Sequence, residues 1–338
     1  MSKTFGKSAA ASVVYIGFAV YLYQPHFKNF DKLQYLLVVN VCLASLGCFV
    51  LSRRWVSSFW GSLFAGAIYG FGPFVLGLAD YHPTAGFLAA TIPWLFLPAA
   101  FGPEAKWRWL RVPLSTLPFL AILLFFQASA YYHLFAIPTQ TKLHLADLSG
   151  LLAPLVTASE GITIIGFYHV PVASLVMGFS MLLAARRFGI MIILCLGTTL
   201  AFCDSFFNIS PIMWLTIPVL CCSVLIGTGM QGLAFAGFAD RKWILMAALI
   251  MAVLSLMTLL LATKYCNIFA GFGSKYAKLP VETAKMYVLG AIAVTILYFI
   301  ARAKLRLHWL RWVVLGSATA VDVFFGARFI VDLSVFGG

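Results

Sequence analysis

Long apolar runs alternate with short polar links along almost the whole chain. A helix needs about 20 residues to cross a hydrocarbon layer of about 30 Å, and backbone within that layer must form its hydrogen bonds internally. With this length as the ruler, the chain divides into eleven predicted spans, at 8–24, 33–51, 56–78, 84–101, 110–128, 161–185, 188–203, 211–236, 242–263, 283–301 and 311–334. We therefore predict an all-α fold, a polytopic transmembrane bundle of about 11 helical spans in which residues 1–338 form a single integral membrane domain.

Two of the predicted spans carry additional signals. The span at 84–101 is punctuated by Pro83, Pro93, Pro98 and Pro103. Because proline breaks or kinks a helix, we expect this span to be kinked or re-entrant. The first span follows two lysines, as a signal peptide would, but no small-residue cleavage pattern follows its apolar core. We expect the first span to be retained.

The basic residues gather in every second link between the spans. These links hold 15 of the 23 lysines and arginines, whereas the intervening links and spans hold 8 of the 10 acids and five of the six histidines. Such sorting is the positive-inside pattern of membrane proteins, in which basic links stay in the cytoplasm. We predict a cytoplasmic N-terminus, a C-terminus outside, and an outer side that carries the acids and histidines.

Composition excludes a water-soluble fold. Hydrophobic residues make up 62% of the 338 and charged residues 10%, whereas soluble domains are near half apolar and about a quarter charged. The formal net charge of +13 does not indicate nucleic-acid binding, because the cations lie at the ends of apolar runs, where anionic lipid headgroups meet them. Membrane lipids are therefore expected partners, and nucleic acid is not.

Two predicted outer connections are longer than turns. In residues 129–160, four leucines recur at helical spacing, which predicts an amphipathic segment over 139–158 on the outer membrane surface. Residues 264–282 are predicted to be a mobile basic loop on an otherwise acidic side. That loop contains Lys275 and Lys278, which are candidate binding residues.

The outer end of the third span is expected to bend. The run from Tyr69 to Pro73 contains two glycines, which thin the helix, and ends in a residue that lacks a backbone donor. The chain then presents Asp80 and His82 at the outer rim. A broken helix beside polar groups is typical of a ligand site near one membrane face. Contact with water at a span end explains the same residues equally well, so both interpretations stay open.

Asp322 lies in the middle of the last predicted span. A charge at that depth costs several kcal/mol unless it is paired or reaches water. Arg328 is six residues later, on another helical face, and pairs more naturally with Asp332 at i+4. Asp322 is therefore a candidate binding residue that faces another helix or a cavity, or else a neutral acid bonded to backbone.

The remaining candidates are acids and histidines of the outer side. Asp147, His169 and Asp204 are candidate binding residues, since carboxylates near imidazoles can act as a general base or bind a divalent cation. Their spacing selects no metal, because the chain has no HExxH and no His pair at i, i+4. Haem held by two histidines is a minor alternative. The cofactor stays open, with a divalent cation expected only for an enzyme.

Residues 33–101 resemble the membrane module of the GT-C glycosyltransferases and their bacterial relatives. The likeness is carried by the Arg53-Arg54 turn, by a span ending in Tyr69-Gly-Phe-Gly-Pro-Phe, and by Asp80-Tyr-His-Pro before a Pro-Trp-Leu-Phe-Leu-Pro span. The later part is similar in order to the same class, through the outer Asp147-Leu148 segment and the spans that follow it.

This resemblance implies a GT-C-like bundle in a bacterial cytoplasmic (inner) membrane. Members of the class move a sugar from a polyprenyl-phosphate donor to an acceptor at the outer face, with an acidic base and often a divalent metal. They carry an acidic motif in a long first outer loop, whereas the corresponding link here is only Gln24 to Lys32, with one acid, Asp31. Either Asp80 or Asp31 is then the catalytic carboxylate, or catalysis has been lost.

Three functions are compatible with these features. The trimmed first loop and the lack of a soluble acceptor domain favour a non-catalytic structural or accessory subunit of a complex with other membrane proteins. The first alternative is a glycosyltransferase in which Asp80 or Asp31 deprotonates the acceptor. In that enzyme, Lys275 or Lys278 meets the donor phosphate. The second alternative is a transporter, favoured by the broken span and Asp322, although no inverted repeat is visible.

Overall fold

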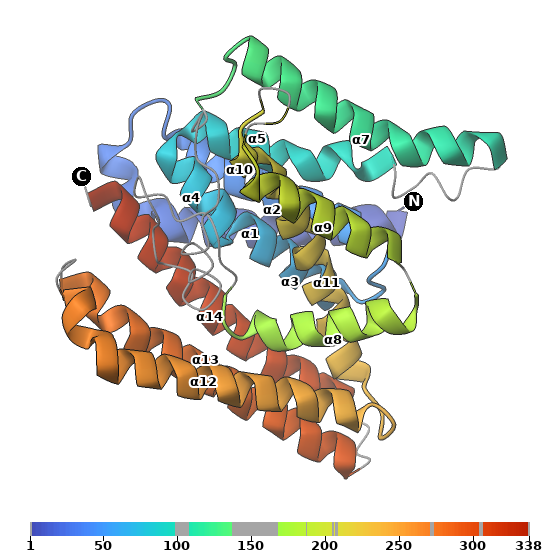
Figure 1. Ribbon diagram of the computed structural model, residues 1–338, viewed down its shortest axis with the longest axis vertical. Coiled ribbons are helices and arrows are strands. Elements are labelled where there is room, and N and C mark those ends of the chain that lie inside the picture. Colours follow the sequence, from blue (N-terminus) through green and yellow to red (C-terminus); the bar gives the residue numbers. More distant parts are fainter. Residues whose placement is uncertain are drawn as a thin grey trace.

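The computed structural model describes residues 2–98, 108–136, 168–186, 188–204, 206, 209–270, 274–303 and 307–336. The helices in these residues are α1 (Ser2–Tyr23), η1 (Gln24–Asn29), α2 (Tyr35–Ser52), α3 (Phe59–Gly70), α4 (Pro73–Tyr81), α5 (Pro83–Leu95), α7 (Arg108–Tyr131), α8 (Pro171–Ala184), α9 (Phe188–Phe202), α10 (Pro211–Trp214), α11 (Thr216–Phe235), α12 (Arg241–Ala270), α13 (Ser274–Arg302) and α14 (His308–Phe336). One isolated bridge joins Phe206 to Ile209. The all-α prediction is confirmed for this part of the chain (Figure 1).

Within the described ranges, six helical segments are long and apolar enough to cross a membrane. They are Tyr35–Ser52, Phe59–Tyr81, Pro211–Phe235, Arg241–Thr263, Val281–Arg302 and His308–Asp332. Shorter apolar helices, α8 and α9 among them, pack with these six. The chain is therefore a polytopic helical membrane protein in contact with lipid. A helix lies in each of the eleven predicted ranges, and the number of crossings stays a prediction.

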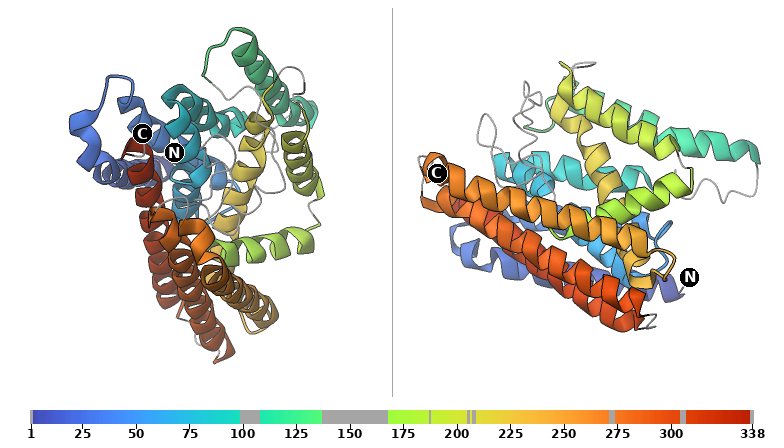
Figure 2. Two further views of the ribbon diagram at one scale, coloured as in Figure 1. Left: turned by 60° about the vertical axis from the view of Figure 1, so that its left-hand side comes forward. Right: turned by 60° about the horizontal axis from the view of Figure 1, so that its bottom comes forward.

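The two chain ends lie at opposite ends of the bundle. The N-terminus of α1 is at one end and the C-terminus of α14 is at the other (Figure 1 and the right-hand view of Figure 2). Helices α12, α13 and α14 lie together along one side in all views. The orientation of the bundle in the membrane stays a prediction.

The broken helix α3–α4 is the most enclosed of the candidate spans. In the most apolar 18-residue stretch of Phe59–Tyr81, 89% of the residues are buried. The corresponding share is 28% for Arg241–Thr263 in α12. Helix α3 ends at Gly70, Gly72 is extended, and Pro73 opens α4. Because proline has no backbone N–H and suits the first turn of a helix, it ends one helix and starts the next. The predicted break is confirmed.

Close helix contacts are made where glycines remove the side chain. A Cβ atom on Gly227 of α11 would lie 2.8 Å from the carbonyl oxygen of Gly61 in α3. A Cβ atom on Gly229 would overlap the carbonyl oxygen of Ser174 in α8. Small residues let membrane helices approach backbone to backbone. Helix α11 therefore packs against both α3 and α8 through its glycines.

Helices α12 and α13 form a hairpin of 30 and 29 residues. Each is about 45 Å long at 1.5 Å per residue, which exceeds the hydrocarbon thickness. Helix α12 continues to Ala270 and α13 begins at Ser274, so the prediction of a loop over 264–282 is wrong for most of that segment. The polar residues there extend the helices instead of ending them, because a helix need not stop where the apolar run stops.

The structure describes one of two other predicted segments in part and the second one not at all. Helix α5 has 13 residues, about 20 Å, and includes Pro93, so it is shorter than the predicted span at 84–101. Residues 99–101 lie outside the described residues, and re-entrance stays a prediction. The amphipathic segment predicted over 139–158, with Asp147, also lies outside them.

At the end of the bundle where Arg53, Arg54 and Arg241 lie, which we call the basic end, side chains of α14 contact the last carbonyl groups of α11. The buried Arg311 guanidinium donates to the carbonyl oxygen of Ala236, and His308 Nδ1 lies 3.2 Å from that of Ala234. The last carbonyl groups of a helix lack intrahelical donors and attract cations. Part of the basic cluster near α14 therefore holds two helices together.

Candidate functional site

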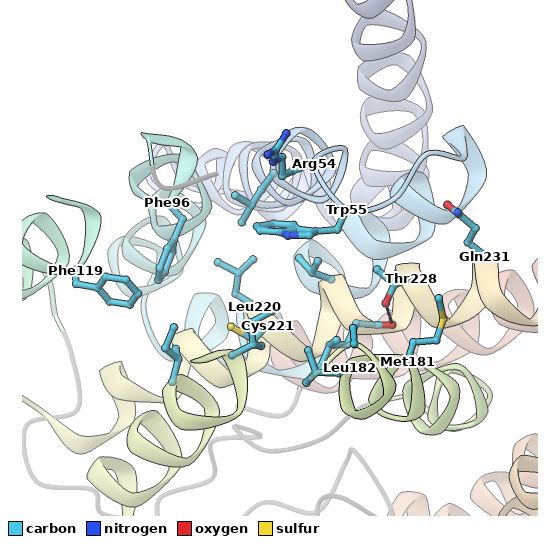
Figure 3. A pocket seen from close by; sticks show the side chains of 17 residues that line it. Arg54, Trp55, Phe96, Phe119, Met181, Leu182, Leu220, Cys221, Thr228 and Gln231 are labelled. Carbon is cyan, nitrogen blue, oxygen red and sulfur yellow. Dashed lines mark hydrogen bonds between the residues drawn. The ribbon is translucent and has the colours of Figure 1, made fainter. Parts of the chain in front are cut away.

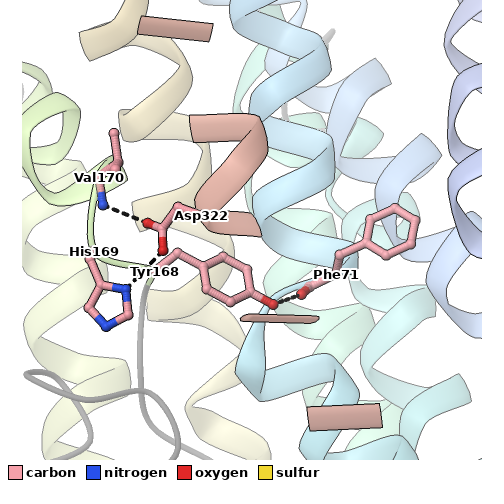
Figure 4. Close-up of polar contacts among 5 residues, drawn as sticks. All are labelled: Phe71, Tyr168, His169, Val170 and Asp322. Carbon is pink, nitrogen blue, oxygen red and sulfur yellow. Dashed lines mark hydrogen bonds and ion pairs between the residues drawn. The ribbon is translucent and has the colours of Figure 1, made fainter. Parts of the chain in front are cut away.

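A polar junction lies inside the bundle where three groups of helices meet. It is formed by the segment Tyr168 to Val170, which leads into α8, together with Asp322 of α14 and the break between α3 and α4 (Figure 4). We call these contacts the polar junction. Two of the predicted binding residues, His169 and Asp322, meet here although 153 residues separate them.

Both carboxylate oxygens of Asp322 have partners. The residue is only 1% exposed, its Oδ1 lies 2.8 Å from His169 Nδ1, and its Oδ2 accepts a hydrogen bond of 2.6 Å from the Val170 backbone N–H. A carboxylate accepts only, so this contact favours the tautomer in which His169 Nδ1 carries the proton. The expectation that Asp322 faces another segment, and not Arg328, is met.

Tyr168 extends the polar junction to the broken helix. Its hydroxyl donates to the carbonyl oxygen of Phe71, a residue placed between the end of α3 and the start of α4 (Figure 4). A carbonyl ahead of the α4 N-cap has no intrahelical donor, so the tyrosine satisfies a group that the break exposes. Gly326 makes room for the Tyr168 ring, because a Cβ there would overlap it.

The remaining ring nitrogen of His169 is enclosed by the bundle. Nε2 is buried, without a hydrogen-bond partner in the described part of the chain, and the ring stands edge-on to Tyr287 of α13 at 4.9 Å between centroids. The polar junction thus binds α8, α13 and α14 to the α3–α4 break. Sequence reasoning missed Tyr168, which nothing distinguishes from the other twelve tyrosines except its place beside His169.

The two catalytic candidates lie in one corner of the bundle, near the C-terminal part of α14. Asp80 lines a cavity of about 180 Å³ together with Tyr23, Gln34 and others. The backbone N–H of Asp31 donates to Gln34 Oε1 at 2.9 Å. Both Asp80 and Asp31 are exposed. Gln34 therefore connects the loop of one candidate to the cavity of the other.

His82 is engaged in the local backbone. Its Nδ1 lies 2.7 Å from Thr84 Oγ1 and accepts from the Thr84 backbone N–H at 3.3 Å, which caps the start of α5. His82 therefore caps α5, and both the ligand-site and the solvation interpretations of this span end stay predictions.

A histidine–carboxylate contact that the sequence did not predict lies in the same corner. His26 in η1 is buried, and its Nε2 lies 3.0 Å from Asp332 of α14, 306 residues away. Arg328 Nε lies 3.5 Å from the same carboxylate, so the predicted i+4 pair is confirmed. Asp332 therefore joins the link between α1 and α2 to the last helix.

Of the remaining predicted binding residues, the structure describes the side chain of Asp204 alone. Asp204 is exposed after α9. Lys275 and Lys278 lie in the first turns of α13, but their side chains are outside the described part of the structure. Asp147 is outside the described residues altogether. Among the described residues, no group of three or more His, Cys, Asp or Glu side chains could hold a metal ion. Comparisons of the chain with protein-family models, curated proteins and solved structures gave no match.

A second, larger cavity of about 480 Å³ lies near the basic end of the bundle (Figure 3). Helices α2, α5, α7, α8, α9 and α11 or their caps contribute its lining. None of the predicted binding or catalytic residues lines it. The cavity is thus separate from the polar junction and from the cavity that Asp80 lines.

Proposed function

We propose that the chain is a non-catalytic subunit of a membrane protein complex and that a transmembrane helix of a partner protein packs against α1. The observation that carries this proposal is an exposed face of α1 on which three of four residues are glycine or alanine. Gly6, Ala10, Val13 and Gly17 follow one another at helical spacing and are exposed. A Cβ atom on Gly6 or Gly17 would meet nothing within 4 Å.

The glycines at close helix contacts differ from these two. Gly66 and Gly70 of α3 lie against Ser45 of α2, as Gly227 and Gly229 of α11 lie against α3 and α8. Glycine in a helix interior costs about 1 kcal/mol relative to alanine, so it persists where close packing offsets that cost. On α1, a partner helix would supply the missing contact.

The placement of the acids agrees with a non-catalytic role. Asp322, the only buried acid among the described residues, has both oxygens occupied by His169 and Val170, and it lines neither described cavity. A carboxylate that itself attacks a substrate or binds a transported ion would need a free oxygen. The Tyr168 hydroxyl likewise occupies the Phe71 carbonyl oxygen at the α3–α4 break. This contact argues against a transport pathway through the break.

A glycosyltransferase remains the second candidate, because Asp80 lines a cavity at the outer end and Asp31 is connected to it through Gln34. The resemblance to the GT-C class supports this alternative and a bacterial cytoplasmic membrane as the location. The cavity of about 180 Å³ is smaller than the roughly 300–1,000 Å³ of ligand sites, so a polyprenyl-phosphate sugar would need more room than it offers.

We expect Gly17→Leu to release the partner without destabilising the chain. The chain, purified from its own membrane in lipid nanodiscs, would have a native mass above 37.1 kDa by the mass of a partner. A leucine side chain keeps the partner backbone away from α1. Gly17→Leu should therefore weaken partner binding tenfold or more, which is a loss of about 1.4 kcal/mol of binding free energy, and lower the partner-bound fraction accordingly. Native mass spectrometry measures the fraction, and thermal unfolding should be unchanged.

Gly189→Leu is the matched control, since Gly189 at the start of α9 also has nothing within 4 Å. This variant should keep the partner. Equal loss in both variants would indicate a non-specific effect of the larger side chain. A monomeric wild-type chain whose Asp80→Asn variant loses sugar transfer from a polyprenyl-phosphate donor would instead favour the glycosyltransferase.

A further inference from the structure

The cavity of about 480 Å³ is an apolar chamber with a cation at its margin. Its walls are formed mainly by aliphatic and aromatic side chains, such as Leu182, Leu220 and Phe96. Its size falls within the roughly 300–1,000 Å³ of sites that hold small molecules. Such a chamber suits a flexible hydrocarbon chain.

The polar side chains of the lining are few and are engaged in the fold. Thr228 Oγ1 donates to the Leu225 carbonyl oxygen at 2.8 Å within α11. Gln231 Oε1 accepts from the Ser58 backbone N–H at 3.0 Å, which ties α11 to the start of α3. These contacts leave the interior of the chamber apolar, so a polar ligand group would have to stay at the mouth.

The residues at the margin belong to one membrane interface. Arg54 and Trp55 follow Arg53, the C-cap of α2. Ala185 is the C-cap of α8, and Ile190 lies in the first turn of α9. In Figure 3 the Arg54 guanidinium lies at the edge of the lining, beside the Trp55 ring. Tryptophan and arginine at a helix end are typical of the headgroup level of a membrane.

We infer that this cavity binds one acyl chain of an anionic phospholipid from the leaflet at the basic end, with Arg54 meeting the phosphate. The acyl chain of the lipid fills the apolar chamber, and the lipid headgroup stays at the level of Arg54 and Trp55. Charge complementarity selects the ligand: the mouth offers a cation, and the exposed Arg186 follows the lining residue Ala185. A neutral or zwitterionic lipid would gain less from the same contacts.

Photolabelling tests this inference on the whole chain in nanodiscs. The probes are phosphatidylglycerol and phosphatidylcholine that carry the same diazirine at the end of one acyl chain. We expect phosphatidylglycerol to label peptides of α8 and α11 that contain Met181, Leu182 and Leu220, about fivefold more than phosphatidylcholine does. Labelling spread evenly over the lipid-facing helices, or equal labelling by both probes, would overturn the inference.

Two neighbouring arginines give a matched pair of variants. Arg54→Gln should reduce labelling of the cavity peptides by phosphatidylglycerol about fivefold, because one cation near an anionic headgroup is lost. Arg53→Gln should change it less than twofold, since Arg53 does not line the cavity. Equal effects of the two substitutions would contradict a specific role for Arg54.

A filling variant and a competitor complete the test. Cys221→Trp places a large ring in the cavity and should abolish labelling of α8 while other helices keep their background label. If this variant does not fold, the comparison of Arg54→Gln with Arg53→Gln decides alone. A long-chain polyprenyl phosphate that displaces the label more strongly than unlabelled phosphatidylglycerol would overturn the assignment to a phospholipid.

Discussion

Replacing Asp322 by alanine is expected to destabilise the bundle by about 3–5 kcal/mol. The carboxylate accepts from His169 Nδ1 and from the Val170 N–H, and all three groups are inside the protein. Its removal leaves two buried donors without an acceptor, and each unsatisfied group costs about 1–3 kcal/mol. Thermal unfolding in nanodiscs, followed by tryptophan fluorescence, measures the change.

Asp322→Asn should fall between alanine and the wild type, because the amide oxygen can accept one of the two hydrogen bonds. Asp332→Ala on the same helix is the control. Its side chain is 46% exposed, so water can enter where the carboxylate was, but the buried His26 ring loses this contact. The cost should therefore be about 1–3 kcal/mol, below that of Asp322→Ala. Wild-type stability in both Asp322 variants would show that the polar junction contributes nothing.

Gly229→Ala is expected to separate α8 from α11 and to lower the unfolding temperature by about 5 °C or more. The added methyl group would overlap the Ser174 carbonyl oxygen, and the backbone nitrogen of Gly178 would lie only 2.8 Å away. Both neighbours are backbone atoms of a packed helix, so no side chain can rotate to make room. The helices must move apart, and the contacts between them are lost.

Gly17→Ala provides the matched comparison for this substitution. Its Cβ would meet nothing within 4 Å, and alanine has the higher helix propensity, by about 1 kcal/mol. Its unfolding temperature should therefore be equal to or above that of the wild type. If Gly229→Ala were as stable as Gly17→Ala, the close approach of α8 and α11 would be wrong.

The fold class could be read from the sequence because apolar runs of membrane length have few alternatives to helix. The break before Pro73 was also predictable, since proline and glycine act locally. The hairpin of α12 and α13 was predicted wrongly between 264 and 282, because hydropathy reports the apolar part of a helix and not its end.

Long-range partners could not be predicted from one sequence. The position of Asp322 predicted that it needs a partner, but helical periodicity does not say which distant segment faces it, and His169 is 153 residues away. The pair of His26 and Asp332 was missed for the same reason. The lining of the larger cavity was equally hidden, because a leucine that faces a cavity and one that faces lipid look alike in a sequence.

The orientation of the bundle can be measured directly with single cysteines. In a variant without the seven native cysteines, Arg186→Cys and Asp204→Cys would report on the two ends of α9. A membrane-impermeant maleimide added to intact cells should label position 204, and should reach position 186 only after the membrane is permeabilised. Labelling of both positions from the same side would contradict a bundle whose basic end stays in the cytoplasm and whose acidic end faces outward.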